Sequence, residues 1–147
     1  MLDRLQIVFA CLERHQVEYV VIGGIAAVLH GVPRTTFDLD ILIAATPDNA
    51  RRLLAALDAA GLGTASLTDE VRLLANEITI FNDWVRLDVQ TSTPGLVFHE
   101  AWARRETMAF RGQRFFVISR ADLIASKRAA GRQQDLQDIR ALEEGGA

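Results

Sequence analysis

Apolar residues along this chain follow two different spacings, which predict where its strands and helices lie. Period-two alternation predicts strands at residues 37–43, 77–81 and 84–91, and a short apolar run rich in β-branched residues predicts one at residues 19–22. Residues 106–110 and 114–118 are predicted to be the strands of a second hairpin, joined by a tight loop that contains a glycine. Apolar residues that recur every three or four positions predict helices at residues 2–15, 47–60 and 119–130. Further helices are predicted at residues 25–30, 96–104 and 135–142. Residues 64–75 fit either structure. Strands interleaved with helices indicate a domain that combines both kinds of element.

The stretch from residue 19 to residue 43 contains the first candidate site. A double glycine, Gly23-Gly24, directly follows the first strand, where the chain turns sharply or its backbone approaches another group closely. In strand 37–43, alternation places Asp38 and Asp40 on one face and Phe37 on the other. Neighbouring carboxylates repel each other, and Mg²⁺, which prefers carboxylate oxygens, would offset that repulsion. The alternative interpretation is a solvated strand face with two surface aspartates.

Asp88 is a third carboxylate, in the middle of strand 84–91 between apolar residues. One interpretation is a structural charge pair, for example with Arg86 on the same face of the strand. The other is that this strand lies beside strand 37–43 and brings Asp88 within reach of Asp38 and Asp40. His30, Trp84 and Trp102 could line a pocket, but packing is the simpler role for each.

Composition narrows the classes of protein to consider. The chain has 147 residues, which predicts a single domain spanning residues 1–147. A net charge of −3 makes a general nucleic-acid-binding module a poor fit, although a local groove could still be positive. The only cysteine, Cys11, lies in an apolar helical pattern and is predicted to be a buried thiol. We expect a soluble, cytoplasmic protein, because neither a signal peptide nor an apolar run long enough to cross a membrane is visible.

The order of these motifs resembles a known superfamily. A double glycine, a short helix, a glycine, an arginine and two aspartates one residue apart form the pattern of the nucleotidyltransferases that include polymerase β. The chain is most similar to small bacterial members of the abortive-infection type, found in toxin–antitoxin operons. The superfamily's usual Gly-Ser pair is Gly23-Gly24 here. The run SRADLIASKRAAGRQQDLQDIRAL is similar to the C-terminal signature of the same subgroup.

This resemblance implies an α+β (mixed α/β) fold of the polymerase β palm-like nucleotidyltransferase type. Its central mixed β-sheet would be flanked by helices, with the C-terminal helices over the site. It also implies transfer of a nucleoside monophosphate from a nucleoside triphosphate (NTP), such as ATP, to a hydroxyl group of RNA, a protein or a small molecule. Asp38 and Asp40 would hold two Mg²⁺ ions, and Asp88 would complete the site of one ion and help to deprotonate the acceptor.

The same resemblance assigns the phosphate contacts and the biological setting. Backbone N–H groups around Gly23-Gly24, together with Arg34 and Lys127, would bind the triphosphate, whereas spacing alone describes Lys127 as a solvated helix lysine. A toxin–antitoxin or phage-defence role would add a cognate toxin or antitoxin protein as partner. The alternative function is an inactive nucleotide-binding or partner-binding module with the same fold, which the absence of the serine favours.

Overall fold

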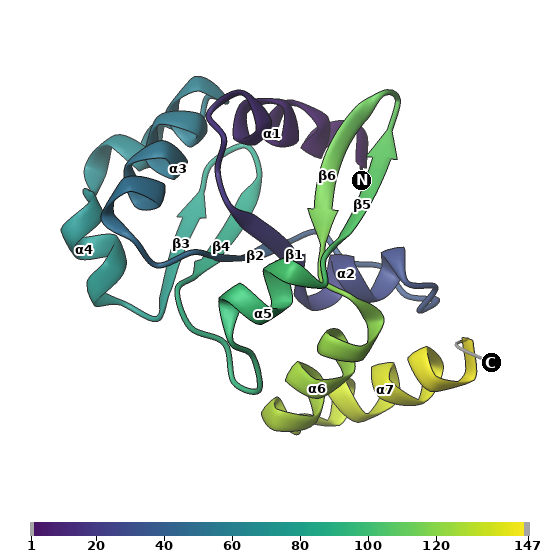
Figure 1. The fold of residues 1–147 in the computed structure, drawn as a ribbon. Coiled ribbons are helices and arrows are strands. Elements are labelled where there is room, and N and C mark those ends of the chain that lie inside the picture. The colour runs from purple at the N-terminus through teal and green to yellow at the C-terminus, as the bar shows by residue number, and fades with distance from the viewer. Residues whose placement is uncertain (1, 146–147) are drawn as a thin grey trace.

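The computed structural model describes residues 2–145 and contains a six-stranded mixed sheet with the strand order β3-β4-β2-β1-β6-β5 (Figure 1). The strands are β1 (Tyr19–Ile22), β2 (Leu39–Ile43), β3 (Ile78–Asn82), β4 (Arg86–Gln90), β5 (Glu106–Phe110) and β6 (Gln113–Val117). The helices are α1 (Leu2–Arg14), α2 (Gly23–Leu29), α3 (Pro47–Ala59), the 3₁₀ helix η1 (Gly63–Leu67), α4 (Glu70–Ala75), α5 (Phe98–Ala103), α6 (Arg120–Ala130) and α7 (Gln133–Gly145). The predicted α+β fold with a mixed sheet flanked by helices is therefore confirmed.

Strand pairing places the predicted acidic residues side by side. β1 pairs antiparallel with β2, and β2 pairs parallel with β4, as a crossover through α3 and α4 allows. In this register Asp40 lies opposite Ile22 on one side and opposite Asp88 on the other. Asp88 in turn lies opposite Ile80 on the edge strand β3. Directly paired residues share a face of the sheet, so both carboxylates point to the same side.

The ends of several helices follow the local chemistry of the sequence. Thr46 accepts a hydrogen bond from the backbone N–H of Asn49 at the start of α3, and Ser119 does the same for Asp122 at the start of α6. Gly131 ends α6 with a φ of 66°, a left-handed conformation that favours glycine. The ambiguous segment 64–75 is helical, divided between η1 and α4.

The predicted strand 37–43 was too long at its start, and the predicted strand 84–91 was too long at both ends. Phe37 lies outside β2 and is 75% exposed, because β1 ends opposite Asp40 and provides no partner for it. Residues 84 and 85 belong to the loop between β3 and β4, in which the N–H of Asp83 donates to the carbonyl of Val85. Trp84 instead covers the end of α3, with its indole N–H donating to the carbonyl of Ala60.

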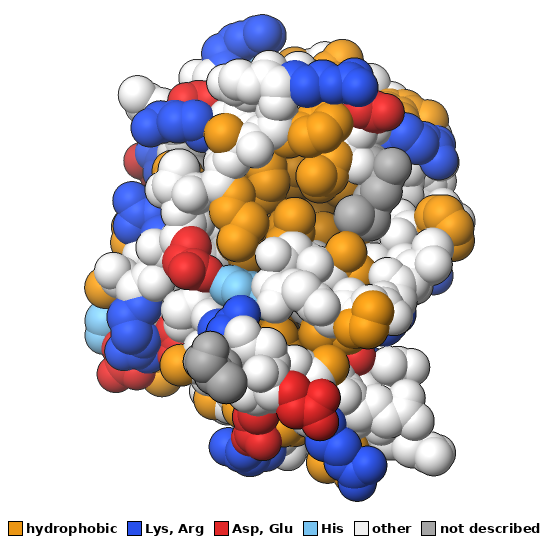
Figure 2. Space-filling view, turned by 90° about the vertical axis from the view of Figure 1, so that its right-hand side faces the viewer, with side chains coloured by type: hydrophobic (Ala, Val, Ile, Leu, Met, Phe, Trp, Pro, Cys, Tyr) orange, Lys and Arg blue, Asp and Glu red, His pale blue; other side chains and the backbone are white. Residues whose placement is uncertain are grey.

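The core lies mainly between the sheet and its helices. Phe9 of α1 stacks on Phe115 of β6 with ring centroids 4.4 Å apart, and Cys11 is buried in the same core, as predicted. Figure 2 shows the right-hand side of Figure 1, where hydrophobic side chains gather in a hollow bordered by charged residues. Within residues 2–145, no helix is both long enough and apolar enough to cross a membrane.

Candidate active site

Asp40 and Asp88 form a close pair of carboxylates on neighbouring strands. Their positions are directly opposite each other in the β2–β4 register, and the side chain of Asp88 is only 17% exposed. Burial, and then the nearby carboxylate of Asp88, raise the pKa of Asp40 to about 7. Two carboxyl groups held this closely favour sharing a proton or binding a cation.

Asp38 and Arg86 lie at the open edge of this pair. The Nε of Arg86 is 3.1 Å from an oxygen of Asp88 and 3.8 Å from an oxygen of Asp38. Asp38 precedes β2, and its side chain is 51% exposed. Within residues 2–145, no three acidic, histidine or cysteine side chains already surround a common point. The structure thus brings Asp40 and Asp88 together and leaves Asp38 at the rim, and it also contains the predicted Arg86–Asp88 pair.

The double glycine forms the floor beside the acidic pair. Gly23 has a φ of 69°, and a Cβ at this position would collide with Oδ2 of Asp40 and lie 3.0 Å from its Cγ. A Cβ at Gly24 would lie 2.9 Å from the hydroxyl oxygen of Thr36 and 3.0 Å from Nη2 of Arg34. Gly23 therefore requires glycine, because of its φ and its contact with Asp40, whereas a side chain at Gly24 would displace Thr36 and Arg34.

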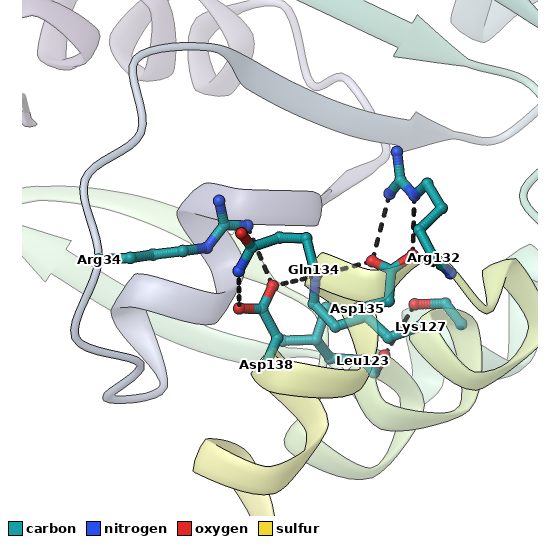
Figure 3. A network of polar contacts seen from close by, with 8 residues as sticks. Arg34, Leu123, Lys127, Arg132, Gln134, Asp135 and Asp138 are labelled. Carbon is teal, nitrogen blue, oxygen red and sulfur yellow. Dashed lines mark hydrogen bonds and ion pairs between the residues drawn. The ribbon is translucent and has the colours of Figure 1, made fainter.

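A buried ion network forms the opposite wall (Figure 3). Arg34, from the loop after α2, and Lys127, from α6, reach the same oxygen of Asp138 on α7, at 3.1 and 2.8 Å. The side chains of Lys127 and Asp138 are only 5% and 1% exposed, so Lys127 is not the solvated lysine that its spacing suggested. Gln134 donates to the second oxygen of Asp138. Asp138 consequently connects the loop after α2 with both C-terminal helices.

Asp135 holds a third cation at the other end of this network. It accepts hydrogen bonds from the backbone N–H and the guanidinium of Arg132, the latter at 2.7 Å, and lies 3.5 Å from Lys127. Burial opposes ionisation of Asp135, but the hydrogen bonds from Arg132 outweigh it and lower the pKa of this carboxyl. The Arg132 side chain is largely exposed, so its guanidinium can reach a bound ligand.

These walls enclose a cleft of about 240 Å³. The cleft is lined by Gly23, Gly24, Arg34, Thr36, Asp38, Asp40, Lys127, Arg132, Gln134 and Asp135. It combines the carboxylates of Asp38 and Asp40 and the adjacent glycine backbone on one side with cations on the other. Such a site suits an anionic ligand bridged to the carboxylates by a divalent cation.

The donor atoms of the acidic pair fit Mg²⁺. Asp40 and Asp88 offer only carboxylate oxygens, and Mg²⁺ is commonly held by one or two carboxylates together with phosphates of the substrate. Asp38 would join these ligands by turning its exposed side chain away from Arg86.

The sequence did not identify every residue of this site. Thr36, Arg132, Asp135 and Asp138 were missed, although Asp135 and Asp138 are three residues apart and thus share a face of one helix. His30, by contrast, packs as expected. Its Nε2 lies 2.8 Å from the carbonyl oxygen of Ile118 and 3.2 Å from Glu106. Trp102 stacks under the guanidinium of Arg105.

Comparison with known proteins gives this geometry a context. No curated protein matches the chain. A solved structure with a similar fold is an antigenic nucleotidyltransferase-like protein from Paracoccidioides brasiliensis, with a TM-score of 0.59. The two proteins are 17% identical, and the alignment covers 94% of this chain and 72% of the other. This likeness confirms the predicted nucleotidyltransferase fold. Residues 3–143 match the family described as nucleotidyltransferases of unknown function (DUF6036), and the chain belongs to that family.

Proposed function

We propose that this protein is an Mg²⁺-dependent nucleotidyltransferase that moves a nucleoside monophosphate from an NTP to a hydroxyl acceptor. The observation that supports this function most strongly is the position of Asp40. Its carboxylate lies against the backbone of Gly23 and faces Asp88, in a cleft that also contains Arg34, Lys127 and Arg132. A cation held by the carboxylates would therefore lie next to the groups that can bind phosphate.

Each group has a distinct role in this reaction. Asp38, Asp40 and Asp88 would hold two Mg²⁺ ions, which supply positive charge to the phosphoryl oxygens when bound. Asp88 accepts the proton of the acceptor hydroxyl at a carboxylate oxygen. A bond forms between the acceptor oxygen and the α-phosphorus, and the bond from that phosphorus to the bridging oxygen breaks to release pyrophosphate.

The cationic wall positions the triphosphate. The side chain of Arg34 lines the cleft and is 27% exposed, so its guanidinium can donate to a phosphate oxygen. Lys127 and Arg132 add positive charge, and the backbone N–H groups at Gly23-Gly24 add neutral donors. Asp135 and Asp138 keep these cations in place before the substrate binds.

The acceptor and the biological setting extend this proposal. The acceptor is a hydroxyl group of an RNA end, of a protein or of a small molecule. The similarity of the glycine and aspartate motifs to abortive-infection nucleotidyltransferases supports a role in a toxin–antitoxin or phage-defence system, with a cognate toxin or antitoxin as partner.

Thermal unfolding with each of the four ribonucleoside triphosphates, with and without Mg²⁺, tests the proposal. A ligand at about 100 times its Kd stabilises a protein by about 2.7 kcal/mol, which corresponds to several degrees. We expect a Mg²⁺-dependent rise in Tm for the wild type that is lost in the Asp38→Asn/Asp40→Asn double variant. The absence of a shift with every triphosphate would contradict the proposed function.

A second function is favoured by the position of Arg86. Its guanidinium already contacts Asp88 and Asp38, where a metal would bind, and would suit a module that binds nucleotide or a partner without turnover. Release of pyrophosphate in the presence of acceptor candidates separates the two functions. Mg²⁺-dependent NTP binding, with no pyrophosphate released from the NTP in the presence of any RNA, protein or small-molecule acceptor, would favour the binding module.

A further inference from the structure

A second hollow continues from the cleft and is not used by the phosphate contacts. It measures about 300 Å³ and shares Gly23, Lys127, Arg132 and Asp135 with the cleft. Its remaining lining residues are mostly apolar, namely Ile22, Ile78, Gln90, Thr93, Pro94, Leu123, Ser126 and Ala130. A ligand that fills both spaces carries negative charge at one end and an apolar group at the other.

Three elements build the walls of this hollow. Gln90 follows Asp88 by two residues on β4 and therefore faces the same side of the sheet, with Ile78 directly opposite on β3. Helix α6 provides the facing wall through Leu123 and Ser126. The loop between β4 and α5 closes the third side.

That loop is held against α6 by Gly95. This glycine has a φ of 81°, and a Cβ here would lie 2.8 Å from the carbonyl oxygen of Ala125 and 3.0 Å from Cβ of Ala129. The close approach requires glycine and fixes Thr93 and Pro94 at the edge of the hollow. The wall is thus a constrained part of the fold.

Gln90 supplies an oriented polar group in these apolar surroundings. Its Oε1 accepts a hydrogen bond from the hydroxyl of Thr93 at 2.6 Å. This contact holds the carboxamide oxygen and leaves the amide N–H₂ group available to donate. Ser126 does not compete as a donor, because its hydroxyl donates to the carbonyl of Leu123. Apolar walls with one oriented amide are suited to a flat heteroaromatic ring that has a hydrogen-bonding edge.

We infer that this hollow binds the base of the nucleoside triphosphate, and that Gln90, oriented by Thr93, selects among bases. The inference rests on the proposed function, since it requires the phosphates to lie in the adjoining cleft. A base that offers an acceptor to the Gln90 amide is favoured. A base that presents only a donor there leaves that amide unpaired.

Binding of four α,β-methylene NTPs and of inorganic tripolyphosphate, each with Mg²⁺, tests the inference by calorimetry. Tripolyphosphate reports on the phosphate cleft alone. We expect the wild type to prefer one base, and Gln90→Leu to weaken binding of that NTP about tenfold while tripolyphosphate changes by less than about twofold. Thr93→Val should reduce discrimination among bases in the same way, with Gln90 still present.

Gln113→Leu provides a matched control. Gln113 is also a strand glutamine, but it lies on β6, which β2 and β1 separate from β4, and it contacts Glu13. It should change none of these affinities. Unchanged base preference in Gln90→Leu, or equal losses for NTPs and tripolyphosphate, would overturn the base-binding inference while leaving the phosphate cleft intact. If neither NTPs nor tripolyphosphate bind to the wild type with Mg²⁺, the proposed function fails together with the inference.

Discussion

At the scale of single residues, Gly23 has a backbone conformation that favours glycine and lies directly against the Asp40 carboxylate. We predict that Gly23→Ala lowers both the stability of the fold and Mg²⁺-dependent NTP binding. Alanine would adopt a left-handed φ of 69° and would also collide with the Asp40 carboxylate. The left-handed conformation alone costs about 1–3 kcal/mol, and displacement of Asp40 adds to that cost. Denaturant unfolding and the Tm shift with Mg²⁺ and NTP measure the two effects.

Gly112→Ala is the matched control for this change. Gly112 has a similar φ of 82°, but a Cβ there would meet no atom within 4 Å. This variant should be destabilised only by the cost of the backbone conformation, and its Tm shift with Mg²⁺ and NTP should be unchanged. Equal losses of stability and of binding in the two variants would show that the contact with Asp40 has no effect.

Asp40 gives the protein a pH-dependent stability in the absence of metal. Its pKa rises from 3.8 to about 7 on folding, because of burial and the nearby Asp88. Between these pH values the folded state keeps a proton that the unfolded state releases, so stability falls as the pH rises from about 4 to about 7. We predict that Asp40→Asn, which carries no charge, is more stable than the wild type at pH 8, by roughly 1–3 kcal/mol, and similar to it near pH 4.

Unfolding in chelator across this pH range measures the difference between Asp40→Asn and the wild type. Adding Mg²⁺ at pH 8 should stabilise the wild type and leave the variant unchanged, because the cation offsets the repulsion between the carboxylates. A variant that is less stable than the wild type at every pH would assign Asp40 a structural role.

At the scale of elements, the pairing of α6 with α7 depends on a buried ion pair. We predict that Asp138→Asn destabilises the protein by about 3 kcal/mol, because Lys127 and Arg34 lose the charge that they share. Lys127→Met should also destabilise it. The double variant should lose less than the sum, with a coupling energy of about 1–3 kcal/mol from a double-mutant cycle.

An exposed ion pair between the same helices serves as the control. The side chains of Arg128 and Glu143 are 62% and 50% exposed. Their coupling energy should remain below about 1 kcal/mol and decrease with added salt. Similar couplings for the two pairs would mean that burial does not strengthen the contact of Lys127 with Asp138.

Local signals in the sequence were sufficient for most of these elements. Apolar runs, alternation and turn residues located all six strands, and Thr46 and Ser119 are residue types that favour the starts of helices, as they do in α3 and α6. Strand ends were less predictable. Phe37 continues the alternation of β2, yet it extends past the end of β1 and gains no burial. The limit of a strand depends on where its partner ends, which is a non-local property.

The same distinction separates the predicted site residues from those that were missed. Asp40 and Gly23 belong to a short contiguous motif, whereas Asp138 acts through contacts with Arg34 and Lys127, which are 104 and 11 residues away. The pattern of a single helix does not reveal such partners. A charged residue with apolar neighbours at helical spacing indicates burial, but only the packing of α6, α7 and the loop after α2 identifies its counter-ions.

At the scale of the whole molecule, the charge distribution limits what the protein binds unaided. The net charge is −3, and the cations beside the cleft are paired with Asp135 and Asp138. Nonspecific binding to nucleic acid depends on cations that are free to neutralise phosphates. An RNA acceptor would therefore be recognised only at the RNA end that enters the cleft. This recognition would follow the binding of Mg²⁺ and NTP in the cleft.

We predict that labelled single-stranded RNA binds the protein with a Kd weaker than about 10⁻⁴ M at physiological salt when no ligand is present. Fluorescence polarisation measures this affinity, and repeating it with Mg²⁺ and an α,β-methylene NTP measures any gain from the occupied site. If RNA is the acceptor, affinity rises for RNA with a free 3′ hydroxyl and not for the same RNA with a blocked 3′ end, because only the former offers the reacting oxygen. Tight, salt-sensitive binding to RNA of either kind without ligand would contradict the prediction. It would require a cationic surface that overcomes the protein's overall negative charge.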